Sequence, residues 1–231
     1  MINIDNILNT EVSLYPWAHR VINNIFNKDA FEIINAAASH LSYLSVIDQT
    51  TPVHIDEAIG YGISKDAENV ILDSADLLLK HLEQIIGVHC LNGRLKGSYF
   101  IMPKFGITGR QFQYPIHDES VYKVMNLVCY LQPEHSVGTK LYSGPTAELL
   151  VKQIEWQPNR AALFYPGKDI TWHNWTGQPS DQPRITLNFF VERMEALQNT
   201  LYKPGEDEAS LQSLLWFYEK IGQDRLHINI G

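Results

Sequence analysis

The sequence predicts a mainly β protein with flanking helices, of the α+β class. Short runs rich in β-branched and aromatic residues, separated by Gly, Pro, Asn and Ser, follow one another from about residue 97 to 192. Two stretches before them have the apolar periodicity of amphipathic helices. Many short strands at close spacing favour a jelly-roll sandwich or barrel, because closing or doubling a sheet protects its edges.

Helices are expected on both sides of the strand-rich region. Apolar residues recur at steps of three or four between Lys28 and Ser45, and a stronger stripe begins at Ser64 and ends where Gly87 can cap a helix. A third helix is expected from roughly Glu206 to Ile221. The apolar faces of these helices must be buried, so we expect the helices to pack on a sheet.

The strands are expected within six segments: SYFIMPKF, VYKVMNLVCYL, TKLYS, AALFYPG, ITWHNW and RITLNFFVE. With 231 residues, 45% of them hydrophobic, the chain is long enough to bury one substantial core. We therefore expect one domain, in which residues 1–96 form a helical support, 97–192 the β core, and 193–231 a C-terminal helix and tail.

The composition of the chain restricts the classes of binding partner and the cellular compartment that we expect. The formal net charge of −8 comes without a basic stripe, which argues against nucleic acid or an anionic membrane and favours a protein or small-molecule substrate. Cys90 and Cys129 lie in apolar stretches and are expected to be buried thiols in a reducing compartment. Without a leader-like N-terminus or a spanning segment, a soluble, cytoplasmic protein is expected. No feature of the sequence indicates an oligomeric state.

A candidate metal site lies within the strand-rich half. His117 and Glu119 stand two residues apart in PIHDES, so a strand would turn both side chains to one face and Asp118 away. His173 lies in ITWHNW on another expected strand, and a rolled sheet can bring it to the pair. Two histidines and one carboxylate form the facial triad of non-haem Fe(II) oxygenases, which leaves positions for other ligands.

The His-x-acid pattern has alternatives. His54 and Asp56 match it equally well, but no strand pattern surrounds them. Asp118 remains an alternative carboxylate to Glu119, and both site histidines have a structural interpretation as hydrogen-bonded residues of an apolar sheet.

Arg184 opens the segment RITLNFFV, where alternation places it on one face with Thr186, Asn188 and Phe190. A guanidinium suits bidentate pairing with a carboxylate, and the Thr186 hydroxyl can add a hydrogen bond. This arrangement implies a dicarboxylate co-substrate. The alternative is a structural ion pair of Arg184 with Asp118 or Glu192.

The segment from about Ser98 to Glu192 resembles the double-stranded β-helix core of the 2-oxoglutarate/Fe(II) oxygenases, particularly the prolyl-4-hydroxylase-like branch. The matching elements occur in the family's order: PIHDES, a strand ending in Tyr130-Leu131, Gly138-Thr139, Pro158 before the ALF strand, His173 and Arg184.

The resemblance implies a cupin-like jelly roll in which His117, Glu119 and His173 bind Fe(II) as the catalytic centre. It further implies that Arg184, assisted by Thr186, binds 2-oxoglutarate, with O2 as the oxidant and ascorbate as an accessory. The expected reaction hydroxylates an unactivated C–H bond of a peptidyl (for example prolyl) or small-molecule substrate and releases succinate and CO2.

Two positions depart from the family pattern. The acidic ligand is more often aspartate, whereas this chain has Glu119, and Cys129 stands where prolyl hydroxylases tend to offer a tyrosine. Asn188 or Tyr114 are candidate substitutes for that tyrosine. Alternation also turns Trp175 toward the same side as His173. The rival interpretations are a cupin-like metal protein that does not use 2-oxoglutarate and a catalytically silent binding protein on this fold.

Overall fold

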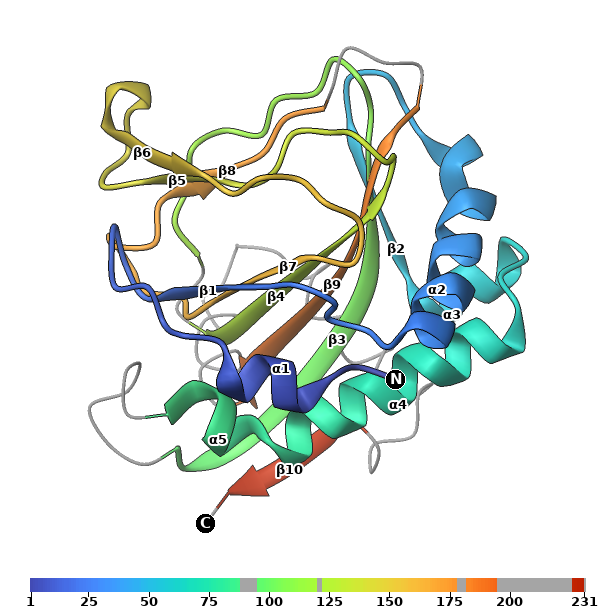
Figure 1. The fold of residues 1–231 in the computed structure, drawn as a ribbon, viewed down its shortest axis with the longest axis horizontal. Coiled ribbons are helices and arrows are strands. Elements are labelled where there is room, and N and C mark those ends of the chain that lie inside the picture. The colour runs from blue at the N-terminus through green and yellow to red at the C-terminus, as the bar shows by residue number, and fades with distance from the viewer. Residues whose placement is uncertain (88–94, 120–121, 178–181, 195–225, 231) are drawn as a thin grey trace, which may run out of the picture.

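Two antiparallel sheets and a layer of helices make up the computed structural model, which describes residues 1–87, 95–119, 122–177, 182–194 and 226–230 (Figure 1). The larger sheet has the order β1-β7-β4-β9-β3-β10, and β2 also pairs with β3. Its strands are β1 (His19–Ile22), β2 (Thr50–His54), β3 (Gly97–Thr108), β4 (Lys123–Gln132), β7 (Ala161–Phe164), β9 (Arg184–Arg193) and β10 (His227–Ile230). The smaller sheet contains β6 (Leu150–Gln153), β5 (Lys140–Tyr142) and β8 (His173–Asn174), in that order. The predicted mainly β class is confirmed.

The helices cover one face of the larger sheet, and the smaller sheet lies on the opposite side (Figure 1). They are α1 (Ile4–Asn9), α2 (Lys28–Leu41), α3 (Ile55–Gly60), α4 (Lys65–Lys80) and α5 (Leu82–Ile86), with 3-10 turns at Ser42–Leu44 and Ala147–Leu149. The side chains of Asn27 and Ser64 cap α2 and α4 by accepting backbone N–H bonds. The helix predicted from Ser64 to Gly87 is divided at His81 into α4 and α5.

Each long strand separates two environments because its side chains alternate between its faces. On β9 the buried residues Ile185, Leu187, Phe189 and Val191 belong to the main core under the helices. The alternate residues, Arg184, Thr186, Asn188 and Phe190, line a cavity on the other face. A second, smaller core lies beside that cavity and contains Trp17, Tyr130, Leu141, Ile154, Trp156, Ala162 and Phe164. The helix-covered core therefore supports a strand whose other face is available for a site.

Several elements were not predicted. The N-terminal region contributes β1 and β2 to the larger sheet, β6 joins the smaller one, and β10 pairs with β3. The helix predicted from Glu206 to Ile221 and Cys90 lie outside the described residues, whereas Cys129 is a buried free thiol. Among the helices the structure describes, none has the length and apolar character required to cross a bilayer.

Candidate metal centre and the cavity beside it

A cavity of about 530 Å³ lies on the inner face of the larger sheet. Its floor comes from β2, β3, β4 and β9, and residues 112–119 and the β8 region close its side. All five predicted site residues, His117, Glu119, His173, Arg184 and Thr186, line this one cavity. The volume lies in the usual range of small-molecule sites.

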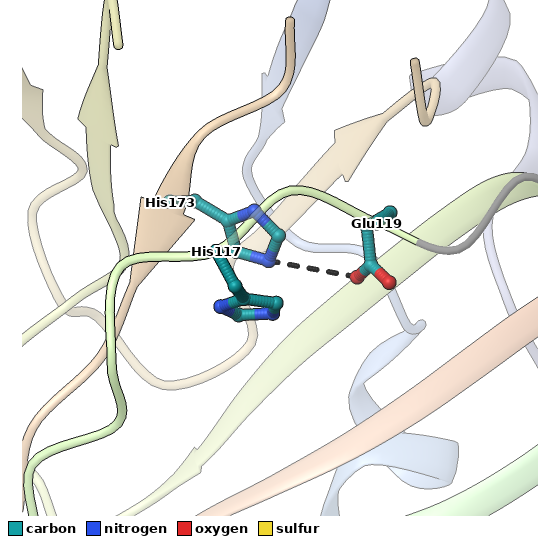
Figure 2. A group of neighbouring side chains, drawn as sticks. All are labelled: His117, Glu119 and His173. Atoms are coloured by element: carbon teal, nitrogen blue, oxygen red, sulfur yellow. Dashed lines mark ion pairs between the residues drawn. The ribbon is translucent and has the colours of Figure 1, made fainter. Parts of the chain in front are cut away.

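The three predicted metal ligands come together at one side of the cavity. His117 and His173 form an isolated antiparallel bridge, in which His117 N donates to His173 O at 3.1 Å and His173 N to His117 O at 2.9 Å. Glu119 follows closely, and the ligand atoms of the three residues all lie within 4.8 Å of one another. Figure 2 shows the three side chains converging from two chain segments. Among the described residues, no other group of three His, Cys, Asp or Glu side chains meets this geometry.

Backbone carbonyls fix the tautomer of both histidines. His173 Nδ1 lies 2.8 Å from Thr171 O, and His117 Nδ1 lies 3.1 Å from Pro115 O. A carbonyl oxygen only accepts, so each Nδ1 carries the proton and each Nε2 of the neutral ring presents a lone pair. Such an orienting bond is typical of metal-binding histidines.

The lone pair of His173 faces a carboxylate. His173 Nε2 lies 3.5 Å from Glu119 Oε1 (Figure 2). Two acceptors face one another stably only with a cation between them, either a proton on the imidazole or a metal ion. The donor set of two imidazoles and one carboxylate, 3% exposed at His173 and 8% at Glu119, fits a divalent transition metal.

The surroundings favour a neutral His117 ring and an ionised Glu119 carboxylate. Burial, followed by repulsion from His173, lowers the pKa of His117 to about 4, so its ring is neutral at pH 7. For Glu119 burial opposes ionisation, but a hydrogen bond from His173 when Nε2 of that ring is protonated, together with the charge of Lys123, outweighs burial and holds the pKa of Glu119 below the ordinary value. The carboxylate is therefore ionised.

Glu119 is held by two residues that the sequence did not single out. Lys123 Nζ donates to Glu119 Oε2 at 2.8 Å, and Asn126 Nδ2 donates to Oε1. Asp118, the alternative ligand, instead accepts the backbone N–H of Asp169 at 2.7 Å. The expected strand through PIHDES is reduced to the bridge at His117, yet Glu119 reaches His173 and Asp118 does not. A polar residue on an otherwise apolar strand, such as Asn126 in VMNLVCYL, was the available signal.

Arg184 lies at one end of the cavity floor and is 3% exposed. Its Nε donates to Val137 O at 3.1 Å, and its guanidinium lies over Trp156 at 5.0 Å and Tyr130 at 5.7 Å. Burial lowers its pKa to about 10, which leaves it charged at pH 7. No ion pair among the described residues includes Arg184, so neither Asp118 nor Glu192 neutralises it. Its terminal nitrogens are available to an anion.

Gly138 permits the turn that supplies the Val137 carbonyl. A Cβ at Gly138 would lie 1.7 Å from Ile154 O, a contact that no side chain tolerates. The next residue, Thr139, lines the cavity and accepts a hydrogen bond from Tyr130. This close packing holds the segment against Arg184.

Thr186 occupies the next cavity-facing position and is 2% exposed. It lies opposite Gly106 of β3, where an added Cβ would approach Thr186 Oγ1 at 3.0 Å and Asn188 Nδ2 at 3.1 Å. Glycine at this position leaves room for both polar groups. They remain directed into the cavity.

Aromatic rings pack around the side of the cavity that contains His117 and His173. Tyr114 stacks on Trp175 with ring centroids 4.1 Å apart, and its edge meets His117 at 4.5 Å. Trp175 lines the cavity as its alternation predicts. Cys129, the position of the expected tyrosine, is fully buried in the main core, whereas Tyr114 and Asn188 both line the cavity.

His54 and Asp56 do not contribute to this group. His54 is the last residue of β2, a strand that was not predicted, and the N-cap of α3. Asp56 lies in the first turn of α3. Neither residue belongs to the three-ligand group. Local sequence matching alone therefore does not identify the site.

Comparison with known proteins supports the same fold. A prolyl-4-hydroxylase from Pseudomonas putida superposes with a TM-score of 0.53 at 13% identity, covering 82% of this chain and 96% of that protein. A Trichoplax adhaerens prolyl hydroxylase, solved with a peptide from the oxygen degradation domain of hypoxia inducible factor, gives 0.55 at 16% identity, covering 84% and 91%. The non-haem α-ketoglutarate-dependent epimerase SnoN from nogalamycin biosynthesis gives 0.52 at 8% identity, covering 76% of each chain.

No family model and no curated protein sequence matches the chain. The likeness is therefore one of three-dimensional structure. This chain has the double-stranded β-helix fold of the 2-oxoglutarate/Fe(II) oxygenases, of the prolyl-4-hydroxylase-like kind.

Proposed function

We propose that the protein is an Fe(II)- and 2-oxoglutarate-dependent oxygenase. One observation carries the proposal: a His-Glu-His group, buried at Glu119 and His173 and half-buried at His117, lines the same cavity as an arginine without a counter-ion among the described residues. The group provides the facial ligand set of non-haem iron, and the arginine provides the partner of a co-substrate carboxylate.

Each residue has a defined role in this proposal. His117 and His173 hold Fe(II) through Nε2, and Glu119 holds it through its carboxylate. Arg184 binds the distal carboxylate of 2-oxoglutarate, and the Thr186 hydroxyl adds a hydrogen bond. When bound, iron with 2-oxoglutarate and O2 supplies the oxidising chemistry that hydroxylates a C–H bond and yields succinate and CO2, with ascorbate as an accessory reductant.

The surrounding residues position these ligands and exclude water. Thr171 O and Pro115 O orient the imidazoles, while Lys123 and Asn126 orient the carboxylate. The Tyr114–Trp175 stack shields the metal side from solvent. A dry site strengthens the electrostatic interactions inside it.

The substrate proposed for this site is a peptidyl side chain, such as proline, or a small molecule. The peptide-bound Trichoplax adhaerens neighbour supports the first class, and the epimerase of nogalamycin biosynthesis supports the second. The rival function is a cupin-like metal protein that does not use 2-oxoglutarate. The charged, buried Arg184 favours the oxygenase over this rival.

Anaerobic reconstitution with Fe(II) tests the proposal. Addition of 2-oxoglutarate should produce a weak visible charge-transfer band, and admission of air should give slow succinate release without a prime substrate. His173→Ala should abolish both signals, while His135→Ala, an exposed loop position, should retain them. Tight iron binding by the wild type without the band would favour the cupin-like rival.

A further inference from the structure

Two lysines converge over one aromatic ring at the opposite end of the cavity from Arg184. Lys104 Nζ lies 4.7 Å and Lys123 Nζ 4.4 Å from the ring centre of Phe190. Phe190 belongs to β9, and the lysines reach it from the neighbouring strands β3 and β4. All three side chains line the cavity.

The two lysines differ in their counter-ions. Lys123 pairs with Glu119 at 2.8 Å, whereas Lys104 forms no ion pair or hydrogen bond with the residues that the structure describes. Burial, followed by repulsion from Lys123, lowers the pKa of Lys104. Placing a second ammonium here without a partner is unfavourable for the empty protein.

Neighbouring groups do not remove this excess of positive charge. Glu192, which is paired with Lys123 across β9 and β4, is 3% exposed, and burial raises its pKa to about 7, so it is only partly ionised near neutral pH. His54 is paired with Lys104 across β2 and β3, and burial followed by the Lys104 charge lowers its pKa. Glu119 faces both Lys123 and the metal position. In a chain with net charge −8, this local excess of positive charge calls for an anion.

We infer that Lys104 and Lys123, with Phe190 beneath them, form a second anion subsite that binds a carboxylate carried by the substrate. Arg184 and Phe190 are six positions apart on β9, which corresponds to roughly 20 Å along an extended strand. A five-carbon dicarboxylate is shorter than this backbone separation, so we treat the two ends as separate anion positions, which the 2-oxoglutarate soak tests.

The subsite specifies a substrate class. Lys123 contacts Glu119, so a carboxylate held by the lysine pair lies next to the proposed iron site. A small carboxylic acid bound there presents its neighbouring carbon atoms to the metal side, and the Phe190 ring supplies an apolar surface for them. The assignment of this acid as the substrate rests on the proposed oxygenase function, whereas the anion subsite itself does not.

Crystals soaked in sodium bromide test the subsite without iron or 2-oxoglutarate. Anomalous scattering should locate a bromide ion between the Nζ atoms of Lys104 and Lys123, and acetate should displace it. Lys104→Met, which keeps an apolar stem, should remove the peak, and Lys104→Arg should keep it. Lys152→Met is the matched control, because Lys152 is exposed on β6 and does not line the cavity.

Three results would overturn the inference: no bromide at the lysine pair of the wild type, a peak that survives Lys104→Met, or a peak that acetate does not displace. A further soak with 2-oxoglutarate separates the two anion sites. Electron density for a 2-oxoglutarate molecule with its distal carboxylate at the lysine pair, and none at Arg184, would assign these lysines to the co-substrate and also overturn the inference. If bromide binds but iron and 2-oxoglutarate do not, the subsite stands and the oxygenase proposal fails.

Discussion

His117 and His173 exchange both backbone hydrogen bonds across one antiparallel bridge, and their rings lie 4.3 Å apart. The backbone therefore brings the two imidazoles together before any metal contributes. In the proposed oxygenase, this bridge makes the metal site largely preorganised, which reduces the conformational cost of binding an ion.

Loss of either bridge imidazole should abolish tight iron binding. We expect His173→Ala to weaken Fe(II) binding by more than roughly 100-fold, because it removes a ligand and not merely a residue that orients one. Equilibrium dialysis under anaerobic conditions measures the effect, with His135→Ala as the control. Unchanged affinity in His173→Ala would remove this histidine from the site.

The choice between the two adjacent carboxylates can be decided by isosteric amides. Glu119→Gln should lower Fe(II) affinity by more than about tenfold, whereas Asp118→Asn should leave it unchanged, because the Asp118 carboxylate accepts a backbone bond from Asp169. The same dialysis measurement applies. The reverse pattern would make Asp118 the ligand.

Replacement of Arg184 should separate co-substrate binding from metal binding. Arg184→Ala should raise the dissociation constant of 2-oxoglutarate by roughly 10- to 100-fold, the usual effect of losing a charged hydrogen bond. Fe(II) affinity should not change. Arg184→Lys should also weaken the binding of 2-oxoglutarate, because an ammonium group cannot form the two parallel hydrogen bonds of a guanidinium. Titration of the charge-transfer band gives the dissociation constants of Fe(II) and of 2-oxoglutarate. An unaltered dissociation constant of 2-oxoglutarate in Arg184→Ala would contradict the role assigned to this arginine.

Glu192 should make stability depend on pH. Its folded-state pKa of about 7 lies above the ordinary value of 4.5, so its contribution is fully present below pH 4.5 and is lost as pH rises through 7. Relative to the wild type, Glu192→Gln should therefore become progressively more stable between these values. The 2.5-unit difference corresponds to a change on the order of 3 kcal/mol. Urea unfolding at several pH values measures it, and a pH-independent difference would show that Glu192 ionises normally.

Cys129 should be inert toward thiol reagents in the folded protein. It is fully buried, and burial raises its pKa well above the ordinary value. In a Cys90→Ser background, labelling should proceed only as fast as the protein unfolds. Stoichiometric labelling that is much faster than unfolding would place this thiol on an accessible surface.

The parts of the site on regular strands were readable from the sequence. In RITLNFFV, simple alternation predicted the cavity-facing residues from Arg184 to Phe190, and the apolar residues between them are in the main core. The prediction succeeded because β9 is flanked on both sides by long strands that keep its pleat regular.

The two N-terminal strands, β1 and β2, could not be predicted from the sequence. β2 includes Pro52, which lowers strand propensity, and β1 is a four-residue segment. Both form because longer strands, β3 and β7, are available to pair with them. Similarly, the meeting of Lys104 and Lys123 depends on the register of β3 and β4 relative to β9, a long-range property that neither segment contains.

The two faces of β9 have different roles, because one packs in the main core and the other lines the cavity. Exchanging Thr186, Asn188 or Phe190 alters the cavity while Leu187 and Phe189 continue to pack under the helices. An insertion of a single residue would do the opposite, turning Arg184 toward the hydrocarbon core and leucine into the cavity. Ligand selectivity can thus be altered here by substitution, whereas a one-residue insertion that no β-bulge absorbs would disrupt the core and the cavity together.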